Sequence, residues 1–410
     1  MRTARILSAL LLGVLTLTAC GDSDESSAGG EKATGEPIVV GGQAPSKGAA
    51  AFPQSEDGLK AGEWYVNNVL GGVDGRPLEV DVCQGDGSPE TAINCANGFA
   101  SSGVPLVLDA YDLSIGGAVP ILGDAKIPII GTLAGTPVPD AAPYGNAFYF
   151  SGPTALSALG SMTVLEKLGK EDLALGVTDA PSTHAYVDTL MKPIAEALGM
   201  NLDASYISST GANFNVVAAT QLSGDPDVTG IMALPEDGCT SLFQALRQQG
   251  YDGTIFAGSC SQFIEQMGAD AAGAVVQPRL WVPLTYDNAP ADVQEDLDAF
   301  SSSMEEIGKG DQLSARSLYS FALVVNLVNV LETIDGEITP DTVRTAMQSL
   351  VDFPTFAGPE VTCDGEQWPG LPSSCSREAI FFEVQDDGTL APVDEDEIWT
   401  ELDPSVIPSA

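Results

Sequence analysis

The chain has 410 residues, and 57 Asp and Glu against 16 Lys and Arg give a formal net charge of −41 at pH 7. This excess of acidic residues argues against nucleic acid or anionic lipid headgroups as partners, because both contacts need clustered Lys and Arg; we interpret it as a solvated shell. The length is too great for one parallel-sheet core and suits two.

The N-terminal segment predicts export. A short basic region holds Arg2 and Arg5, and the apolar stretch 6–17 that follows is too short to span a bilayer as a stable helix. The run Leu17-Thr18-Ala19-Cys20 then resembles a bacterial lipobox, in which the signal peptide is cut before the cysteine and the thiol carries diacylglycerol. An ordinary secretory signal with an incidental Cys20 is the alternative.

We therefore expect a lipoprotein signal peptide at 1–19 and a lipidated, flexible tether at 20–36, since 21–36 contain no apolar residue larger than alanine. Acyl chains on Cys20 would anchor the protein to the cell membrane, so the expected location is extracytoplasmic and the lipid is the only expected membrane contact. The best later apolar run, 321–331, is too short to cross a membrane and is predicted to be a buried helix.

Six cysteines remain after Cys20, and an even number in an exported chain indicates disulfides. Their clustering along the chain favours three local pairs, Cys83–Cys95, Cys239–Cys260 and Cys363–Cys375. None of the spacings is a CxxC, so the sequence predicts no zinc site and no redox motif. We expect no metal and no cofactor.

Strands and helices alternate from residue 37 onward, which predicts an α/β fold. In the first series, strands are expected at 37–42, 78–82, 104–108 and 127–132, with helices at 53–69, 89–101 and 114–122. Ser88 is the expected N-cap of the second helix. An interruption at 139–153 is interpreted as the first passage to a second lobe.

The second series begins after this interruption. Helices are expected at 154–168, 184–198, 214–222 and 240–249, and strands at 173–177, 201–207, 228–234 and 254–257. Strands separated by helices imply parallel sheets with right-handed crossovers, so the predicted fold is two doubly wound lobes. Ligands of such sheets bind outside the carboxyl ends of the strands, which places the expected cleft between the lobes.

One segment resembles a known family. The run 67–80, NNVLGGVDGRPLEV, is similar to the helix-to-strand joint of the Leu/Ile/Val-binding family, the solute receptors of ABC importers with the type I periplasmic-binding fold. Its glycines allow the left-handed backbone that a helix C-cap needs. Further similarities are Ala44-Pro45, the run 250–253, Tyr319 at the start of an apolar helix, and Gly358-Pro359.

The resemblance implies two lobes joined by three crossings, which close around a small molecule and deliver it to a membrane permease. Lobe 1 would comprise 37–148 and 282–372, and lobe 2 would comprise 149–281 and 373–402. The expected ligand is an amino acid, an amide or a small carboxylate, and the expected state is a monomer. An exported sensor of the same fold that signals through a partner protein is the alternative.

Catalysis is not expected. The chain has one histidine, His184, and none of the motifs GxSxG, HExxH, GxxxxGK[ST] or GxGxxG. A divergent exported hydrolase would need a nucleophile elbow, which the sequence lacks.

Candidate ligand residues in lobe 1 follow the third and fourth strands. The family often places consecutive serines after the third strand, whereas this chain has Tyr111 and Asp112. Tyr111 could stack on a flat or apolar ligand and Asp112 could accept a hydrogen bond; core packing and helix capping are the structural alternatives. After the fourth strand, Thr132, Ala134 and Thr136 keep the family's small, hydroxylated character and could bind a carboxylate or carbonyl oxygen.

Candidates in lobe 2 lie at the starts of two helices. The family carries a ligand-facing aromatic residue near His184-Ala185-Tyr186, so either ring could face the cleft; a solvated His184 is the alternative. Amino-acid-binding relatives pair the ligand's ammonium with an acidic residue near the position of Cys260. Its loss here predicts an uncharged or carboxylated ligand, unless Asp112, Glu236 or Asp237 replaces the acid.

Overall fold

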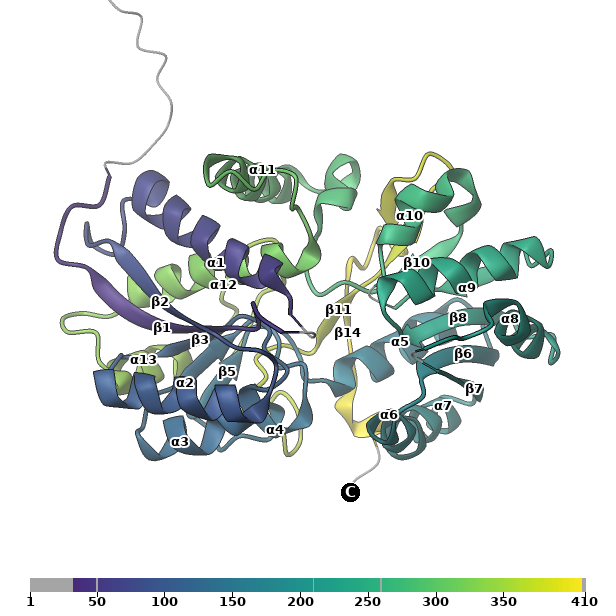
Figure 1. Ribbon diagram of the computed structural model, residues 1–410, viewed down its shortest axis with the longest axis horizontal. Helices are drawn as coiled ribbons and strands as arrows, with labels where there is room; N and C mark the ends of the chain where they lie inside the picture. The colour runs from purple at the N-terminus through teal and green to yellow at the C-terminus, as the bar shows by residue number, and fades with distance from the viewer. Residues whose placement is uncertain (1–31, 49–50, 209, 259, 408–410) are drawn as a thin grey trace, which may run out of the picture.

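The computed structural model describes residues 32–48, 51–208, 210–258 and 260–407. The chain forms two α/β lobes side by side, each built on its own sheet, with the C-terminal residues running back between them (Figure 1). This confirms the predicted fold class. Cys20 and most of the predicted tether lie outside the described residues. No described helix is both long enough and apolar enough to cross a bilayer.

The sheet of lobe 1 is entirely parallel, with the order β2-β1-β3-β4-β5. Its strands are β1 (Ile38–Ala44), β2 (Leu78–Gln84), β3 (Val107–Asp109), β4 (Ile129–Gly131) and β5 (Ala147–Tyr149). Helices α1 (Pro53–Tyr65), α12 (Ala315–Leu331) and α13 (Pro340–Gln348) lie on one side, and α2 (Pro89–Ser102) and α3 (Val119–Asp124) on the other (Figure 1). The two faces bury separate apolar clusters, so this lobe has a complete core of its own.

The sheet of lobe 2 has the order β13-β12-β10-β9-β8-β6-β7. Five of these strands are parallel: β6 (Asp172–Thr178), β7 (Asn201–Ile207), β8 (Val228–Ala233), β9 (Thr254–Phe256) and β10 (Ala274–Val276). The hairpin β12 (Phe382–Val384) and β13 (Leu390–Pro392) adds two antiparallel strands from the C-terminal part of the chain.

The helices of lobe 2 pack on both faces of this sheet. They are α5 (Ala155–Lys167), α6 (Pro181–Tyr186), α7 (Lys192–Ala197), α8 (Phe214–Leu222), α9 (Glu236–Gln248) and α10 (Gln262–Met267). Helices α5 and α7 share one apolar cluster, and α8 and α9 belong to another that also reaches into lobe 1. The lobes therefore meet through packed side chains.

Three crossings connect the lobes. The first follows β5, and the second follows β10 and runs through the 3₁₀ turn η5 (Pro283–Asn288) to α11 (Ala291–Glu306). The third leads to β11 (Glu378–Ile380), which pairs with β14 (Trp399–Glu401) in a two-stranded ribbon between the lobes (Figure 1). The first and third crossings touch: the Tyr149 amide donates to the Ser373 carbonyl at 2.7 Å, and the Cys375 amide donates to the Tyr149 carbonyl at 2.9 Å.

Several predicted elements shift. The passage predicted at 139–153 contains the end of the short helix α4 (Pro137–Asp140) and the buried edge strand β5, so the first crossing begins only at Tyr149, the last residue of β5. The helix predicted at 184–198 begins at Pro181 and is divided by the π-helical turn η3 (Val187–Met191). The helix predicted at 114–122 is a 3₁₀ turn, η2 (Ile115–Gly117), followed by α3. The Ser88 cap is confirmed, because its hydroxyl accepts from the Thr91 amide at 3.3 Å.

The joint between α1 and β2 explains the family-like segment 67–80. Helix α1 continues as the π-helical turn η1 (Val66–Leu70) and ends at Gly71, whose φ of 86° is the left-handed conformation that glycine adopts without strain. The Asn67 side chain then acts as a clamp on the edge strand β2. Its amide donates to the Leu78 carbonyl at 2.7 Å and its oxygen accepts from the Leu78 amide at 2.8 Å.

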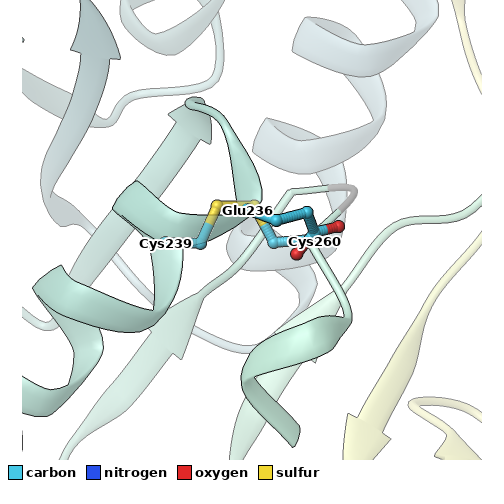
Figure 2. Close-up of side chains that lie close together, drawn as sticks. All are labelled: Glu236, Cys239 and Cys260. Carbon is cyan, nitrogen blue, oxygen red and sulfur yellow. A yellow bond between two sulfur atoms is a disulfide. The ribbon is translucent and has the colours of Figure 1, made fainter. Parts of the chain in front are cut away.

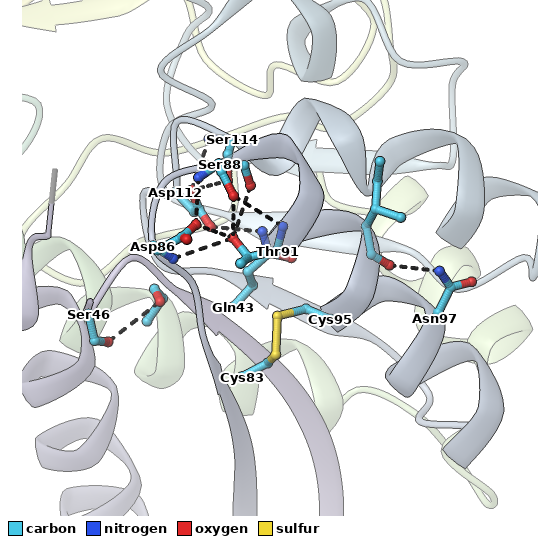
Figure 3. The surroundings of a disulfide bond; sticks show 12 residues. Gln43, Ser46, Cys83, Asp86, Ser88, Thr91, Cys95, Asn97, Asp112 and Ser114 are labelled. Atoms are coloured by element: carbon cyan, nitrogen blue, oxygen red, sulfur yellow. Dashed lines mark hydrogen bonds between the residues drawn. A yellow bond between two sulfur atoms is a disulfide. The ribbon is translucent and has the colours of Figure 1, made fainter. Parts of the chain in front are cut away.

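Three disulfides join the cysteines in the pairing that their clustering favours. Cys83–Cys95 connects β2 to α2 (Figure 3), Cys239–Cys260 connects α9 to the loop after β9, and Cys363–Cys375 lies near the third crossing. Each closes a short loop, so each is expected to stabilise its lobe by about 3 kcal/mol in the chain-entropy model.

Candidate functional site

The two lobes meet around a cavity of about 100 Å³. Its walls come from the loop after β9 (Cys260 and Ser261), from the second crossing (Val282–Leu284) and from the first turns of α12 (Ala315 and Tyr319). Ligand pockets are common at interfaces between domains, but they usually measure roughly 300–1,000 Å³, so this cavity is smaller than a typical ligand site.

Tyr111 of lobe 1 is one of the predicted residues at this meeting place. Its φ of 60° lies in the left-handed region, which is uncommon for a residue with a bulky side chain. The half-buried ring packs beside the apolar cluster shared by the two lobes, and the Arg316 guanidinium carbon lies 5.0 Å from its centroid. The strained backbone thus directs an aromatic ring toward a cation.

Asp112, the next residue, turns into lobe 1. Its carboxylate is fully buried and accepts hydrogen bonds from Gln43 Nε2 at 2.8 Å, the Ser114 amide at 2.9 Å and the Ser114 hydroxyl at 2.7 Å (Figure 3). These bonds tie the loop after β3 to the end of β1. Because both oxygens are used within the lobe, Asp112 serves as a loop brace rather than as a ligand contact.

The loop after β4 lies against α12. Thr132 is buried and its hydroxyl donates to the Tyr319 carbonyl at 2.7 Å, while Ala134 is also buried. Thr136 is half-buried at the N-cap position of α4 and its side chain makes no capping hydrogen bond. Of the two threonines predicted here, Thr136 therefore has the hydroxyl that is less engaged within the protein.

His184 and Tyr186 point to different surroundings. The His184 ring stacks on Tyr206 of β7 at 3.6 Å and its Nε2 lies 2.8 Å from Asp179 Oδ1, with 44% of the side chain exposed. The Tyr186 phenol instead lies near Arg279, and burial raises its pKa, whereas the positive charge of Arg279 acts in the opposite direction. Tyr186 is thus the one of the two that reaches the region between the lobes.

Glu236 stands beside the disulfide Cys239–Cys260 at the start of α9 (Figure 2). Its carboxylate accepts from the Ser261 amide at 3.2 Å and from the Gln262 amide at 3.1 Å. Burial raises the pKa of Glu236, and these two hydrogen bonds and the charge of Arg316 lower it. Although the three side chains are close enough to hold a metal ion, the two sulfurs are bonded to each other, so the group braces two loops.

Two arginines at this meeting place were not predicted. Arg279 lies on the second crossing and Arg316 in the first turn of α12. We call Arg279 and Arg316, together with Tyr111, Tyr186 and Tyr319, the interlobe cluster. The signal in the sequence was a basic residue at 279 inside the apolar run VVQPRLWVP of a chain with few basic residues.

Burial and neighbouring groups act in opposite directions on the pKa of Arg279. Burial lowers the pKa of the Arg279 guanidinium, and four neighbouring groups oppose this effect: Tyr319, Tyr111, Tyr186 and Asp140. The Arg279 backbone amide also donates to the Tyr319 hydroxyl at 3.0 Å, which fixes the second crossing against α12. The cluster thus combines cationic groups with aromatic surfaces.

The arrangement of the two lobes agrees with solved structures of binding proteins. A leucine-binding protein LivK from Thermotoga maritima has 14% identity and a TM-score of 0.67, covering 88% of this chain and 99% of its own. An ABC transporter substrate-binding protein from Aeropyrum pernix has 17% identity and a TM-score of 0.70, covering 92% and 100%. One from Desulfitobacterium hafniense, in complex with Leu, has 18% identity and a TM-score of 0.65, covering 87% and 100%.

At these identities the structural likeness shows the fold alone. The curated proteins contain no match to this sequence. A family model described as periplasmic binding protein matches residues 37–388, which is most of the chain, and the resemblance expected from the segment 67–80 is confirmed. The chain belongs to the periplasmic binding protein family.

Proposed function

We propose that the chain is the lipid-anchored solute receptor of an ABC importer, without enzymatic activity, which captures a small molecule between its lobes and delivers it to a membrane permease. The observation that carries this proposal is the interlobe cluster, in which residues of both lobes and of a crossing lie close together and share Tyr319 with the small cavity. The solved structures with this fold include ABC transporter substrate-binding proteins, one of them in complex with Leu.

The anchor belongs to the same proposal, because acyl chains on the receptor would keep it at the membrane that holds its permease. The lipobox-like run 17–20 supports lipidation at Cys20. Mass spectrometry of the membrane fraction should find a mature N-terminus at a diacylated Cys20, and the variant Cys20→Ser should be released or retain its signal peptide. A mature protein that begins elsewhere would refute the anchor and leave the binding role intact.

Solute binding is tested by calorimetry and thermal shift on purified protein. A ligand present at 100 times its Kd should add about 2.7 kcal/mol to the free energy of unfolding. We propose a carboxylate, an amide or an amino acid as ligand, contacted by Tyr111, Thr136 and Tyr186. Leucine, isoleucine and valine form the first panel. The sequence predicts that all three bind weakly, so tight binding of any of them would contradict that prediction. Turnover of any bound solute would contradict the proposed lack of enzymatic activity.

A further inference from the structure

Two arginines of the interlobe cluster carry buried nitrogens that make no hydrogen bond to the described part of the chain. These are Nη1 of Arg279 and Nη1 of Arg316. Neither side chain takes part in an ion pair within 4.0 Å among the described residues. The other described arginines all have oxygen partners: Arg76, Arg247, Arg344 and Arg377.

The guanidinium of Arg279 donates a hydrogen bond to the protein from one nitrogen and none from another. Its Nη2 donates to the Ser157 hydroxyl of α5 at 2.7 Å, whereas its Nη1 has no such partner. The residue stands on the second crossing, between α5 of lobe 2 and Tyr319 of lobe 1. This position lets one cation contact whatever lies between the lobes.

Arg316 is held by aromatic rings. Its guanidinium carbon lies 3.7 Å from the centroid of Phe52 and 5.0 Å from that of Tyr111. Stacking on rings fixes the plane of a guanidinium and leaves its N–H groups, which point outward along the edge, free to donate. Tyr319 accepts a hydrogen bond from the Arg279 amide at 3.0 Å, and the charges of Arg279 and Arg316 both act to lower the pKa of its phenol, so both cations lie near Tyr319.

The nearby carboxylates are partly engaged elsewhere, although Oδ1 of Asp140 is buried without a hydrogen bond to the described part of the chain. Asp140 is buried and accepts from the Thr154 amide at 2.8 Å, and Glu236 accepts from the amides of Ser261 and Gln262. Both act on the arginines electrostatically, but neither lies within ion-pair distance of them. Buried cations without a close anion are unfavourable unless a binding partner supplies the negative charge.

We propose that Arg279 and Arg316 are the anion-recognising residues of this receptor, and that its solute carries a carboxylate but no α-ammonium group. The inference rests on the proposed function and names the chemical class of the solute. A carboxylate offers two oxygens that fit the parallel N–H groups of a guanidinium. An ammonium would instead lie beside two cations, while two of its three candidate partners, Asp112 and Glu236, already bind backbone and side-chain donors, and the third, Asp237, is exposed. The Tyr111 ring provides a surface for a flat or apolar part of the solute.

Calorimetry with two matched pairs of probes tests this assignment. Phenylacetate and phenylacetamide differ in the charge of one group, and 4-methylpentanoate and leucine differ in the ammonium. We expect each carboxylate to bind at least tenfold more tightly than its partner. The variants Arg279→Met and Arg316→Met should each weaken carboxylate binding at least tenfold and change phenylacetamide binding much less.

A matched control removes the same charge elsewhere. Lys167→Met breaks an exposed ion pair with Glu397 on lobe 2, at 3.0 Å, and should leave the ratio of acid to amide affinity unchanged. If Arg279→Met fails to fold, Arg279→Lys keeps the charge without the fork and should lose part of the preference. A purely structural arginine would alter acid and amide affinities equally, so the ratio distinguishes the two roles.

The remaining outcomes separate this inference from the proposed function. Leucine binding as tightly as 4-methylpentanoate, or an amide as tightly as its acid, overturns the inference while the receptor role stands. The same holds if none of the four probes binds but a neutral or zwitterionic solute does. If no solute of any class binds, both the receptor role and the inference fail.

Discussion

Glu378 gives the ribbon between the lobes a pH dependence that can be measured. It lies on β11 directly opposite Glu401 of β14, with Glu360 also near. Burial, together with the charges of these two glutamates, raises the pKa of Glu378 to about 7. Arg377 is the nearby cation, and its guanidinium pairs with Glu401 at 2.9 Å. Glu378 thus faces like charge without a cation of its own.

The direction of the pH effect on stability follows from proton binding. The folded protein holds the Glu378 proton more tightly than the unfolded chain, whose glutamates titrate near 4.5. The free energy of unfolding should therefore fall as the pH rises from about 4.5 to about 7 and level off above that range. Each tenfold difference in proton affinity is worth about 1.4 kcal/mol. Because the side chain is partly exposed and solvent screens the repulsion, we expect about 1 to 2 kcal/mol in total.

The substitution Glu378→Gln keeps the shape and removes the charge. Urea unfolding followed by circular dichroism at several pH values between 4.5 and 8 should show Glu378→Gln gaining about 1 to 2 kcal/mol over the native chain at pH 8 and little at pH 4.5. Glu383→Gln, on the exposed side of β12, is the matched control, because it removes one carboxylate from a neighbouring strand and leaves the ribbon unchanged. Parallel curves for Glu378→Gln and the native chain would refute the reasoning.

Two further substitutions test local structure. Asn67→Ala removes both hydrogen bonds to Leu78 and should lower the free energy of unfolding by about 2 kcal/mol. The control Asn68→Ala loses one hydrogen bond within its own helix and should cost less than about 1 kcal/mol. Equal losses in urea titrations would contradict the role of Asn67 as a clamp. Gly135→Ala forces a side chain onto a φ of 70°, with its Cβ 2.9 Å from the Tyr111 ring, and should cost about 1 to 2 kcal/mol, while an unchanged midpoint would show that this loop tolerates a side chain.

The architecture could be predicted from the sequence, because long parallel strands and the glycine-containing joints beside them have recognisable local patterns. Strands β1, β2, β6 and β7 each have seven residues, and all four were predicted with their flanking helices. Strands β3, β4 and β9 have only three residues and were still predicted, whereas β5 and β10, which are equally short, were missed. Their positions depend on pairing with neighbours far along the chain.

The candidate site was predictable only in part, because the roles of its side chains depend on distant partners. The Asp112 carboxylate accepts a hydrogen bond from Gln43, 69 residues earlier, and no local pattern in the sequence reveals this pairing. Residues two apart on a helix face nearly opposite sides, so His184 and Tyr186 could not both face the region between the lobes. Arg279 was missed because it follows β10, a strand that the sequence did not predict.

The three crossings also limit how the lobes can move. Two bodies joined by one linker can twist, slide and bend relative to each other, but the hydrogen bonds of Tyr149 with Ser373 and Cys375 fasten two crossings to each other along part of their length. Twisting would have to stretch one crossing against its neighbour, whereas bending about a line through them changes only a few backbone angles. Lobe motion should therefore be dominated by one low-energy hinge rotation about the crossings. Each closure would then bring the same faces together.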